Sequence, residues 1–275
     1  MYKTIALFLF FCNLTNAQVP VSIFNSTDKK PVLYASIWKD SKMYTASDSL
    51  GLFYVRNSDL DSEFKISCVG YKTLHIKIAA DVSSIFLEND VKQLNEVTIV
   101  VPKRNKTFKL GKSKNGDITV VCTNRENQAV LTGKYFATVN QENLFLSKLK
   151  FRTFSSKENR KVEMFIYAVD ENGAPGKIIN AEPIICQIKK GHHVNEIDLK
   201  KLNIEMPKEG VFVAIQYLFL EENRQYGTHN KEWFFYEPAI DANETETYTD
   251  SWHFNDGSWK KSDKYSLNFQ LVLTD

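Results

Sequence analysis

The residues best suited to bind a ligand are aromatic side chains near the end of the 275-residue chain. They stand among carboxylates and amides, and the group comprises Trp233, Tyr236, Tyr248, Trp252 and Trp259 together with Asp250, Asn255 and Asp256. Aromatic rings with hydrogen-bonding groups between them can form a concave platform for a carbohydrate or peptide. The simpler alternative, which we favour, is that these rings fill a hydrophobic core, as aromatic side chains usually do.

Motifs of catalytic and metal sites are absent from the sequence. It contains no GxSxG, HExxH, Walker or GxGxxG pattern. A zinc site needs about three convergent ligands, and the adjacent His192 and His193 would point to opposite faces of a strand. Carboxylate pairs such as Glu221 and Glu222 could in principle serve glycoside hydrolysis, but their acidic surroundings favour solvated loops. We therefore predict no enzymatic activity, no metal and no cofactor.

The elements that position these side chains should be β-strands. Aromatic residues make up 13% of the chain, and such residues suit the half-buried surface of a sheet. Short apolar runs alternate with turn signals about every eight to twelve residues, which is the spacing of sandwiches and barrels. We therefore expect an all-β fold.

The first 17 residues have the pattern of a secretory signal peptide. Lys3 is followed by the apolar run 5–11 and, after polar residues, by Ala17 at the expected cleavage site. The run is too short to span a bilayer, which takes about 20 apolar residues. We expect export, a mature chain of residues 18–275 and no transmembrane segment after cleavage.

Three cysteines remain after cleavage, namely Cys68, Cys122 and Cys186. Export allows disulfides, and an odd number of cysteines leaves at least one thiol unpaired. Isolated cysteines in apolar runs usually behave as small buried hydrophobic residues. A bridge between Cys122 and Cys186 is the alternative, and the sequence does not decide between them.

Charge is unevenly distributed along the mature chain and separates it into parts. Residues 18–101 carry a net charge of −1, residues 102–149 carry +6, and residues 150–275 carry −4. The excess of positive charge is greatest in residues 102–114, which include six basic residues and no acidic one. Such composition is typical of a solvated linker, so we predict modules at 18–101 and 115–275. A net charge near zero also argues against a nucleic-acid partner.

The first module carries a family resemblance in three motifs. These are the strand 30–37 (KPVLYASI), the turn 47–53 (SDSLGLF) and the segment 67–71 (SCVGY). Asp48 and Gly51 suit an Asx-type turn, Gly70 suits a bend or bulge, and Tyr71 can pack across a sandwich. In these motifs the region resembles the carboxypeptidase-like regulatory domain, a small β-sandwich, although the family's usual first-strand glycine is missing.

The resemblance implies a location and excludes two activities. In metallocarboxypeptidases this module is an accessory, and the zinc-binding peptidase domain has no counterpart here. The same module begins many TonB-dependent outer-membrane receptors, where a segment similar to residues 94–101 leads into the barrel. About 175 residues follow here, too few for a barrel of about 22 strands, so we do not expect transport by this chain alone. The resemblance implies an exported protein of the Bacteroidota kind, periplasmic or associated with the outer membrane.

The second module should be a larger sandwich. Its apolar and alternating runs predict about eight to ten strands, which suits a jelly roll. Residues 162–176, 194–199, 210–216 and 252–261 resemble the jelly-roll modules of Bacteroidota surface proteins.

Three hypotheses of function remain. We favour a non-catalytic binding or scaffold protein of a Gram-negative cell envelope, with an envelope glycan or an outer-membrane protein as partner. One alternative is a partner subunit of a complex of the TonB-dependent receptor type. A glycan-active enzyme is the least favoured.

Overall fold

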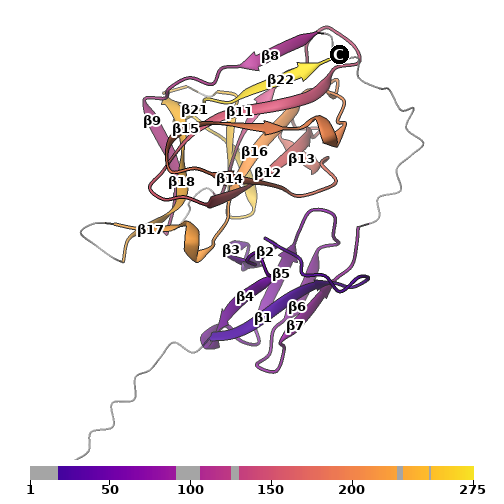
Figure 1. The fold of residues 1–275 in the computed structure, drawn as a ribbon, viewed down its shortest axis with the longest axis vertical. Coiled ribbons are helices and arrows are strands. Elements are labelled where there is room, and N and C mark those ends of the chain that lie inside the picture. Colours follow the sequence, from indigo (N-terminus) through magenta and orange to yellow (C-terminus); the bar gives the residue numbers. More distant parts are fainter. Residues whose placement is uncertain (1–17, 91–105, 125–129, 228–231, 248) are drawn as a thin grey trace, which may run out of the picture.

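The structure, a computed structural model, describes residues 18–90, 106–124, 130–227, 232–247 and 249–275. In these ranges the regular elements are β-strands and three short 3-10 turns, so the predicted all-β class is confirmed. Figure 1 shows two modules, one formed by the early strands and one by the later strands. The predicted signal peptide, the segment 94–101 and Tyr248 lie outside the described residues.

The strands of the first module are β1 (Gln18–Asn25), β2 (Ser36–Lys39), β3 (Lys42–Ala46), β4 (Leu52–Arg56), β5 (Glu63–Ser67), β6 (Leu74–Lys77) and β7 (Ser84–Leu87). The second module contains β8 (Thr107–Gly111), β9 (Ile118–Thr123), β10 (Leu131–Phe136), β11 (Phe145–Ser155), β12 (Arg160–Val169), β13 (Pro175–Ile178), β14 (Ile184–Ile188), β15 (Gly191–Asp198), β16 (Val211–Tyr217), β17 (Arg224–Tyr226), β18 (Phe234–Glu244), β19 (Ser251–Asn255), β20 (Ser258–Lys261), β21 (Tyr265–Leu267) and β22 (Gln270–Thr274). The 3-10 turns are η1 (Asn57–Asp59), η2 (Lys200–Leu202) and η3 (Glu221–Asn223).

The first module is a small sandwich of two sheets. One sheet has the order β4-β1-β7 and the other has the order β3-β2-β5-β6. Alternate residues of the strands are buried between them, including Val21, Ile23, Ile37, Phe53 and Phe64. This period-two burial is what two facing sheets require of their strands.

The turn before β4 is stabilised by the side chain of Asp48. Its Oδ1 accepts hydrogen bonds from the backbone N–H groups of Leu50 (2.8 Å) and Leu52 (2.9 Å), which is an Asx-type turn. Gly51 follows with φ of 75°, and a Cβ there would lie 2.8 Å from the carbonyl oxygen of Ile23. Glycine is therefore required at this position by both its backbone angle and the close approach of β1.

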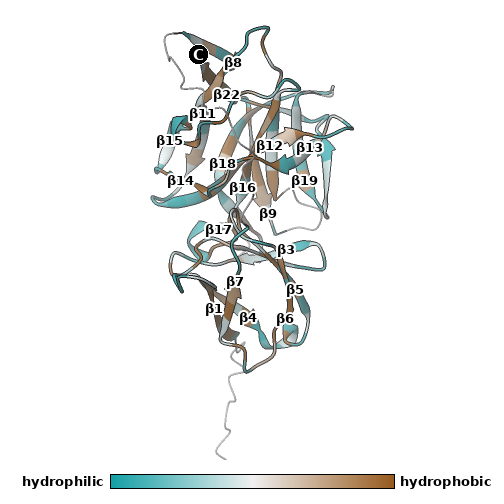
Figure 2. Cartoon of the chain, turned by 90° about the vertical axis from the view of Figure 1, so that its right-hand side faces the viewer, coloured by the Kyte–Doolittle hydropathy of each residue, from teal (hydrophilic) through white to brown (hydrophobic). Residues whose placement is uncertain are grey.

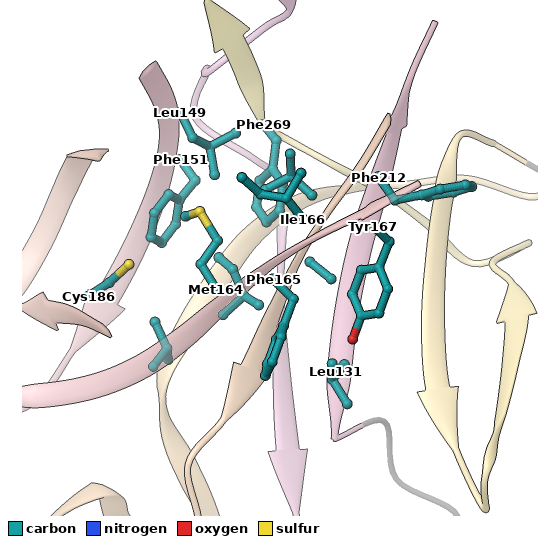
Figure 3. Close-up of a cluster of buried hydrophobic side chains, with 14 of the residues drawn as sticks. Leu131, Leu149, Phe151, Met164, Phe165, Ile166, Tyr167, Cys186, Phe212 and Phe269 are labelled. Atoms are coloured by element: carbon teal, nitrogen blue, oxygen red, sulfur yellow. The ribbon is translucent and has the colours of Figure 1, made fainter. Parts of the chain in front are cut away.

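The second module is built from two larger sheets. We call the seven-stranded one, with order β13-β12-β16-β10-β19-β20 and β14 beside β12, the β12 sheet. We call the eight-stranded one, which contains β11, β18 and β22, the β11 sheet. Side chains such as Met164, Ile166, Phe151 and Phe269 pack between them, as Figure 3 shows.

The structure differs from the sequence prediction in the basic linker 102–114. Strand β8 lies inside this range and pairs with β22, so that Phe108 is opposite Leu273 and Leu110 is opposite Leu271. The alternation of apolar and basic residues is that of an edge strand, where lysines are common on the exposed side. Residues 107–111 of the predicted linker therefore belong to the β11 sheet.

The structure also bears on the cysteines and on the number of strands. Cys68, Cys122 and Cys186 are all free, and Cys122 and Cys186 are buried as small hydrophobic residues would be, so the alternative bridge between them is not formed. Within the described ranges the second module has more strands than predicted, because short hairpin strands such as β19 and β20 carry weak apolar patterns. Figure 2 shows apolar segments along strands of both modules and polar segments in many of the turns. In the described ranges, no helix has the length and apolar character needed to cross a bilayer.

Candidate functional site

The two modules meet through contacts between β2 and β3 of the first module and the β12 sheet of the second. Gln216 on β16 donates a hydrogen bond from Nε2 to the Ser36 hydroxyl (2.6 Å). Thr45 on β3 donates one to the carbonyl oxygen of Phe219 (3.1 Å). The rings of Trp38 and Phe254 meet edge to face, with centroids 6.1 Å apart. These contacts close two sides of a space between the modules.

That space is a cavity of about 560 Å³. The first module lines it with residues of β2 and of the segment from β5 to β6, and the second module lines it mainly with the outer face of the β12 sheet. Its exposed lining residues, Gly70, Thr73, Asp90 and Ala181, mark where it opens to solvent. Small-molecule sites are commonly of this volume and are often found between domains.

The outer face of β12 supplies the central part of the lining. Because side chains alternate along a strand, Val162, Met164 and Ile166 point into the sandwich while Glu163, Phe165 and Tyr167 point away from it. Figure 3 shows this division, with Phe165 and Tyr167 on the side opposite Met164 and Phe151. Both faces of β12 are buried, and only the outer face lies against the cavity.

Glu163 is the only acidic side chain in the buried part of the described lining. It is 2% exposed, and it has neither a hydrogen bond nor an ion pair with any described residue. Burial raises the pKa of Glu163 to about 8, because a carboxylate loses its hydration without gaining a partner. The carboxyl group is thus neutral at acidic pH and accessible to a molecule in the cavity.

The other buried polar groups of the lining already have partners. The Ser67 hydroxyl accepts from Trp38 Nε1 (3.2 Å), and the Ser36 hydroxyl accepts from Gln216. Asn180 accepts from the Ile166 N–H (2.9 Å) through its side-chain oxygen and donates to the Glu182 carbonyl (2.8 Å). Burial first, and then the charge of Glu163, raise the pKa of the Cys68 thiol to about 12. These groups therefore shape the cavity and are not activated nucleophiles.

Aromatic rings form much of the wall. The ring of Trp259 packs edge to face against the rings of Tyr167 and Phe254. The interplanar angles are 79° and 64°, and the centroids are 5.5 Å apart in both pairs. Trp38 is the ring that the first module adds to this wall. Phe165 lies beside Tyr167, with ring centroids 6.0 Å apart. The wall thus combines apolar surface with several aromatic rings.

The structure differs from the sequence prediction of a C-terminal aromatic platform. Tyr236 lies on β18 in the β11 sheet and is stacked on Phe219 with centroids 4.1 Å apart, so it is part of the core. Trp233 precedes β18 and pairs with Phe235. Trp252, on the β12 sheet, packs edge to face on Phe212. The predicted residues are therefore divided between two sheets.

Two further residues of that prediction lie on the β19–β20 hairpin. Asp256 is exposed at its tip with φ of 45°, before Gly257 with φ of 80°. Two positive φ angles in succession are those of a tight hairpin turn, which accounts for the Asp-Gly pair. Of the predicted ligand-binding residues that the structure describes, only Trp259 lines the cavity.

Two of the predicted turn residues also take part in the cavity. Gly70 has φ of 84°, and a Cβ there would lie 3.2 Å from the carbonyl oxygen of Ala181 in the second module. Tyr71 lines the cavity beside it, and its hydroxyl accepts a hydrogen bond from Asn25 (3.5 Å). The bend at Gly70 thus lets the two modules approach closely.

Metal binding finds no support in the described residues. In those ranges no group of three or more His, Cys, Asp or Glu side chains is placed to hold an ion.

Comparisons with known proteins give weak similarity. No family model matches the chain, and no curated protein matches it. Two solved structures share 11% identity with it: the clostridial cysteine protease Cwp84 after propeptide cleavage, with a TM-score of 0.41 over 84% of this chain, and the cysteine protease and lectin-like domains of Cwp84, a surface-layer-associated protein of Clostridium difficile, with a TM-score of 0.40 over 93%. The chain spans about half the length of each, 50%.

Proposed function

We propose that the chain is an exported, non-catalytic binding protein of the cell envelope, and that the cavity between its modules holds the ligand. The observation that carries the proposal is the combination of aromatic walls with one buried, unpartnered carboxyl group in a space of ligand size. Burying such a group costs free energy in the empty protein, and a ligand that pairs with it recovers part of that cost.

A binding role accounts for the lining better than a catalytic one. Nucleophilic catalysis needs a hydroxyl or thiol next to a base. Among the described lining residues, Ser36 and Ser67 are bonded to Gln216 and Trp38, and the thiol of Cys68 is directed at the carbonyl of Leu33 (4.0 Å). These partners are neutral groups and cannot take up a proton as a base would.

Calorimetric titration and thermal shift test the site. The protein of residues 18–275 is screened against envelope glycan fragments, short peptides and small amines, and the hits are repeated with Ala181→Trp, which narrows the opening. We expect at least tenfold weaker binding in this variant, because the bulky ring blocks entry. Asn172→Trp, at an exposed turn away from the cavity, is the matched control and should bind normally.

Equal affinities in all three proteins would contradict the cavity as the site. Export is tested separately by fractionating cells and sequencing the N-terminus of the protein. We expect envelope fractions and a mature chain that starts at Gln18. A cytoplasmic protein that keeps Met1 would contradict the proposed location.

A further inference from the structure

We infer that the cavity binds an organic cation, an alkylammonium group, with Glu163 as its counter-charge and the aromatic rings as its wall. This inference rests on the proposed function, and it adds the chemical class of the ligand.

The carboxyl group of Glu163 is isolated from the other polar groups that the structure describes. A glutamate that is 2% exposed normally has partners, because an unpaired buried charge is costly. Glu237, which is 1% exposed in the same module, accepts from Arg160 Nε (2.9 Å), the Ser156 N–H (2.9 Å) and the Ser155 hydroxyl (3.2 Å). Among the described residues, Glu163 has no such hydrogen-bond donors around it, and it lines a cavity. A ligand in that cavity could therefore supply the donor that the protein does not.

The charged side chains of the described lining are all acidic. Its described acidic residues are Glu163 and, at the exposed opening, Asp90, and none of its described residues is Lys, Arg or His. Two basic side chains of the neighbouring strands already have partners. The Nζ of Lys65 lies 4.9 Å from the centroid of the Trp38 ring, which also lines the cavity, and Lys161 is paired with Glu222. The electrostatic environment therefore favours a cation and disfavours an anion.

The cavity also has an aromatic wall. Trp38, Phe165, Tyr167, Phe254 and Trp259 line the same space as Glu163. A cation within about 6 Å of a ring centroid is attracted to the negative face of the ring, most strongly to tryptophan. Several rings and one carboxyl group together suit a substituted ammonium ion, because its apolar substituents contact the rings while its charge faces Glu163.

Binding of a cation to Glu163 must depend on pH. A cation pairs with the ionised carboxylate, so binding below a pH of about 8 must release the proton of Glu163. The other titratable groups around it are Tyr167 on β12, Cys186 on β14, and Cys68, Tyr71 and Asp90 from the first module. Burial raises the pKa of both Cys68 and Cys186 to about 12, so neither thiol releases a proton in the range from pH 6 to 9.

Calorimetry with three small probes of equal length tests the inference. The probes are n-butylammonium, n-butanol and butyrate, each titrated into the protein of residues 18–275 at pH 6, 7, 8 and 9. We expect n-butylammonium to bind at least tenfold more tightly than n-butanol at pH 9, and butyrate to bind most weakly. The affinity for n-butylammonium should rise about tenfold per pH unit between pH 6 and 8 and then level off.

Two variants with the same change of charge make the test specific. Glu163→Gln should lose at least tenfold in n-butylammonium affinity and also lose the pH dependence, while n-butanol binds as before. Glu182→Gln, an exposed acid next to the opening, should change the affinity less than threefold. Thermal unfolding of both variants verifies that they are folded. The affinities of N-acetyl-lysinamide and n-butylammonium are then compared. Tighter binding of N-acetyl-lysinamide indicates a lysine side chain as the ligand, and tighter binding of n-butylammonium indicates a free amine.

Equal binding of n-butanol and n-butylammonium, unchanged in Glu163→Gln, would overturn the inference. A second outcome would also overturn the inference: the protein does not bind cations, but it binds another ligand, and Ala181→Trp abolishes that binding. The proposed function would then remain intact. If no ligand is sensitive to Ala181→Trp, the proposed function fails as well.

Discussion

Two glutamates of the second module are buried to nearly the same extent in opposite surroundings. Glu237 is 1% exposed and forms an ion pair with Arg160, which is itself buried, and it accepts two further hydrogen bonds. Glu163 is 2% exposed and has no partner among the described residues. This fold thus provides partners for the carboxylate that lies inside its core. The carboxylate without partners is the one that faces the cavity.

The largest effect should come from breaking the paired site. Glu237→Gln leaves the guanidinium of Arg160 buried without its counter-charge, and we expect a loss of about 3 to 5 kcal/mol in the free energy of unfolding. Urea unfolding monitored by circular dichroism measures it. Glu163→Gln is the matched variant and should not destabilise the protein at neutral pH. Equal losses in both would mean that Glu163 also has a structural partner.

The next effect concerns pH. The pKa of Glu163 is about 8 in the folded protein and the ordinary value is 4.5, so between these values the folded state binds more protons than the unfolded state. The free energy of unfolding must then fall as pH rises through this window, by about 1.4 kcal/mol per pH unit. We expect Glu163→Gln to remove this part of the dependence and to be the more stable protein at pH 8. Parallel curves for the two proteins would contradict the unpaired state of Glu163.

A smaller effect should follow from loosening the contact between the modules. Ser36→Ala removes the acceptor of the buried Gln216 amide, and we expect a loss of about 1 to 2 kcal/mol. Unfolding measured by intrinsic fluorescence gives the value, and Ser83→Ala, at an exposed position of the first module, serves as control. A loss below the error of the measurement would show that the amide is satisfied by water.

The smallest effect is expected at a residue predicted from the sequence as part of the ligand site. Asp256→Asn should change the free energy of unfolding by less than about 0.5 kcal/mol, because asparagine tolerates the left-handed backbone of this exposed turn. Ligand affinity measured by calorimetry should also be unchanged. Weaker binding in Asp256→Asn, with Glu163→Gln unaffected, would move the site to the hairpin.

The sequence was sufficient to predict features that depend on neighbours in the chain. The all-β class follows from alternating strands such as β12, and the turn at Asp48 and Gly51 depends on residues within five positions of each other. Strand β8 is harder to predict, because the dense basic residues of 102–114 indicate a linker more strongly than the alternation of Phe108 and Leu110 indicates a strand.

The cavity could not be predicted because it joins residues that are far apart in the sequence. Ser36 and Gln216 are 180 positions apart, and no periodicity relates them. One local signal existed. Glu163 occupies the same face of β12 as Phe165 and Tyr167, so an acid shares a strand face with two large aromatic residues. That pattern indicates that the outer face of β12 is buried. Only the three-dimensional structure shows that the first module packs against this face.

The most direct test of the account is a nuclear magnetic resonance titration of the Glu163 carboxyl carbon, with and without saturating n-butylammonium. In the free protein we expect a pKa near 8, because the group is buried without a partner. The bound cation should lower this pKa clearly, since it stabilises the carboxylate. A pKa near the ordinary value of 4.5, unchanged by the cation, would contradict both the isolation of Glu163 and its role as a counter-charge.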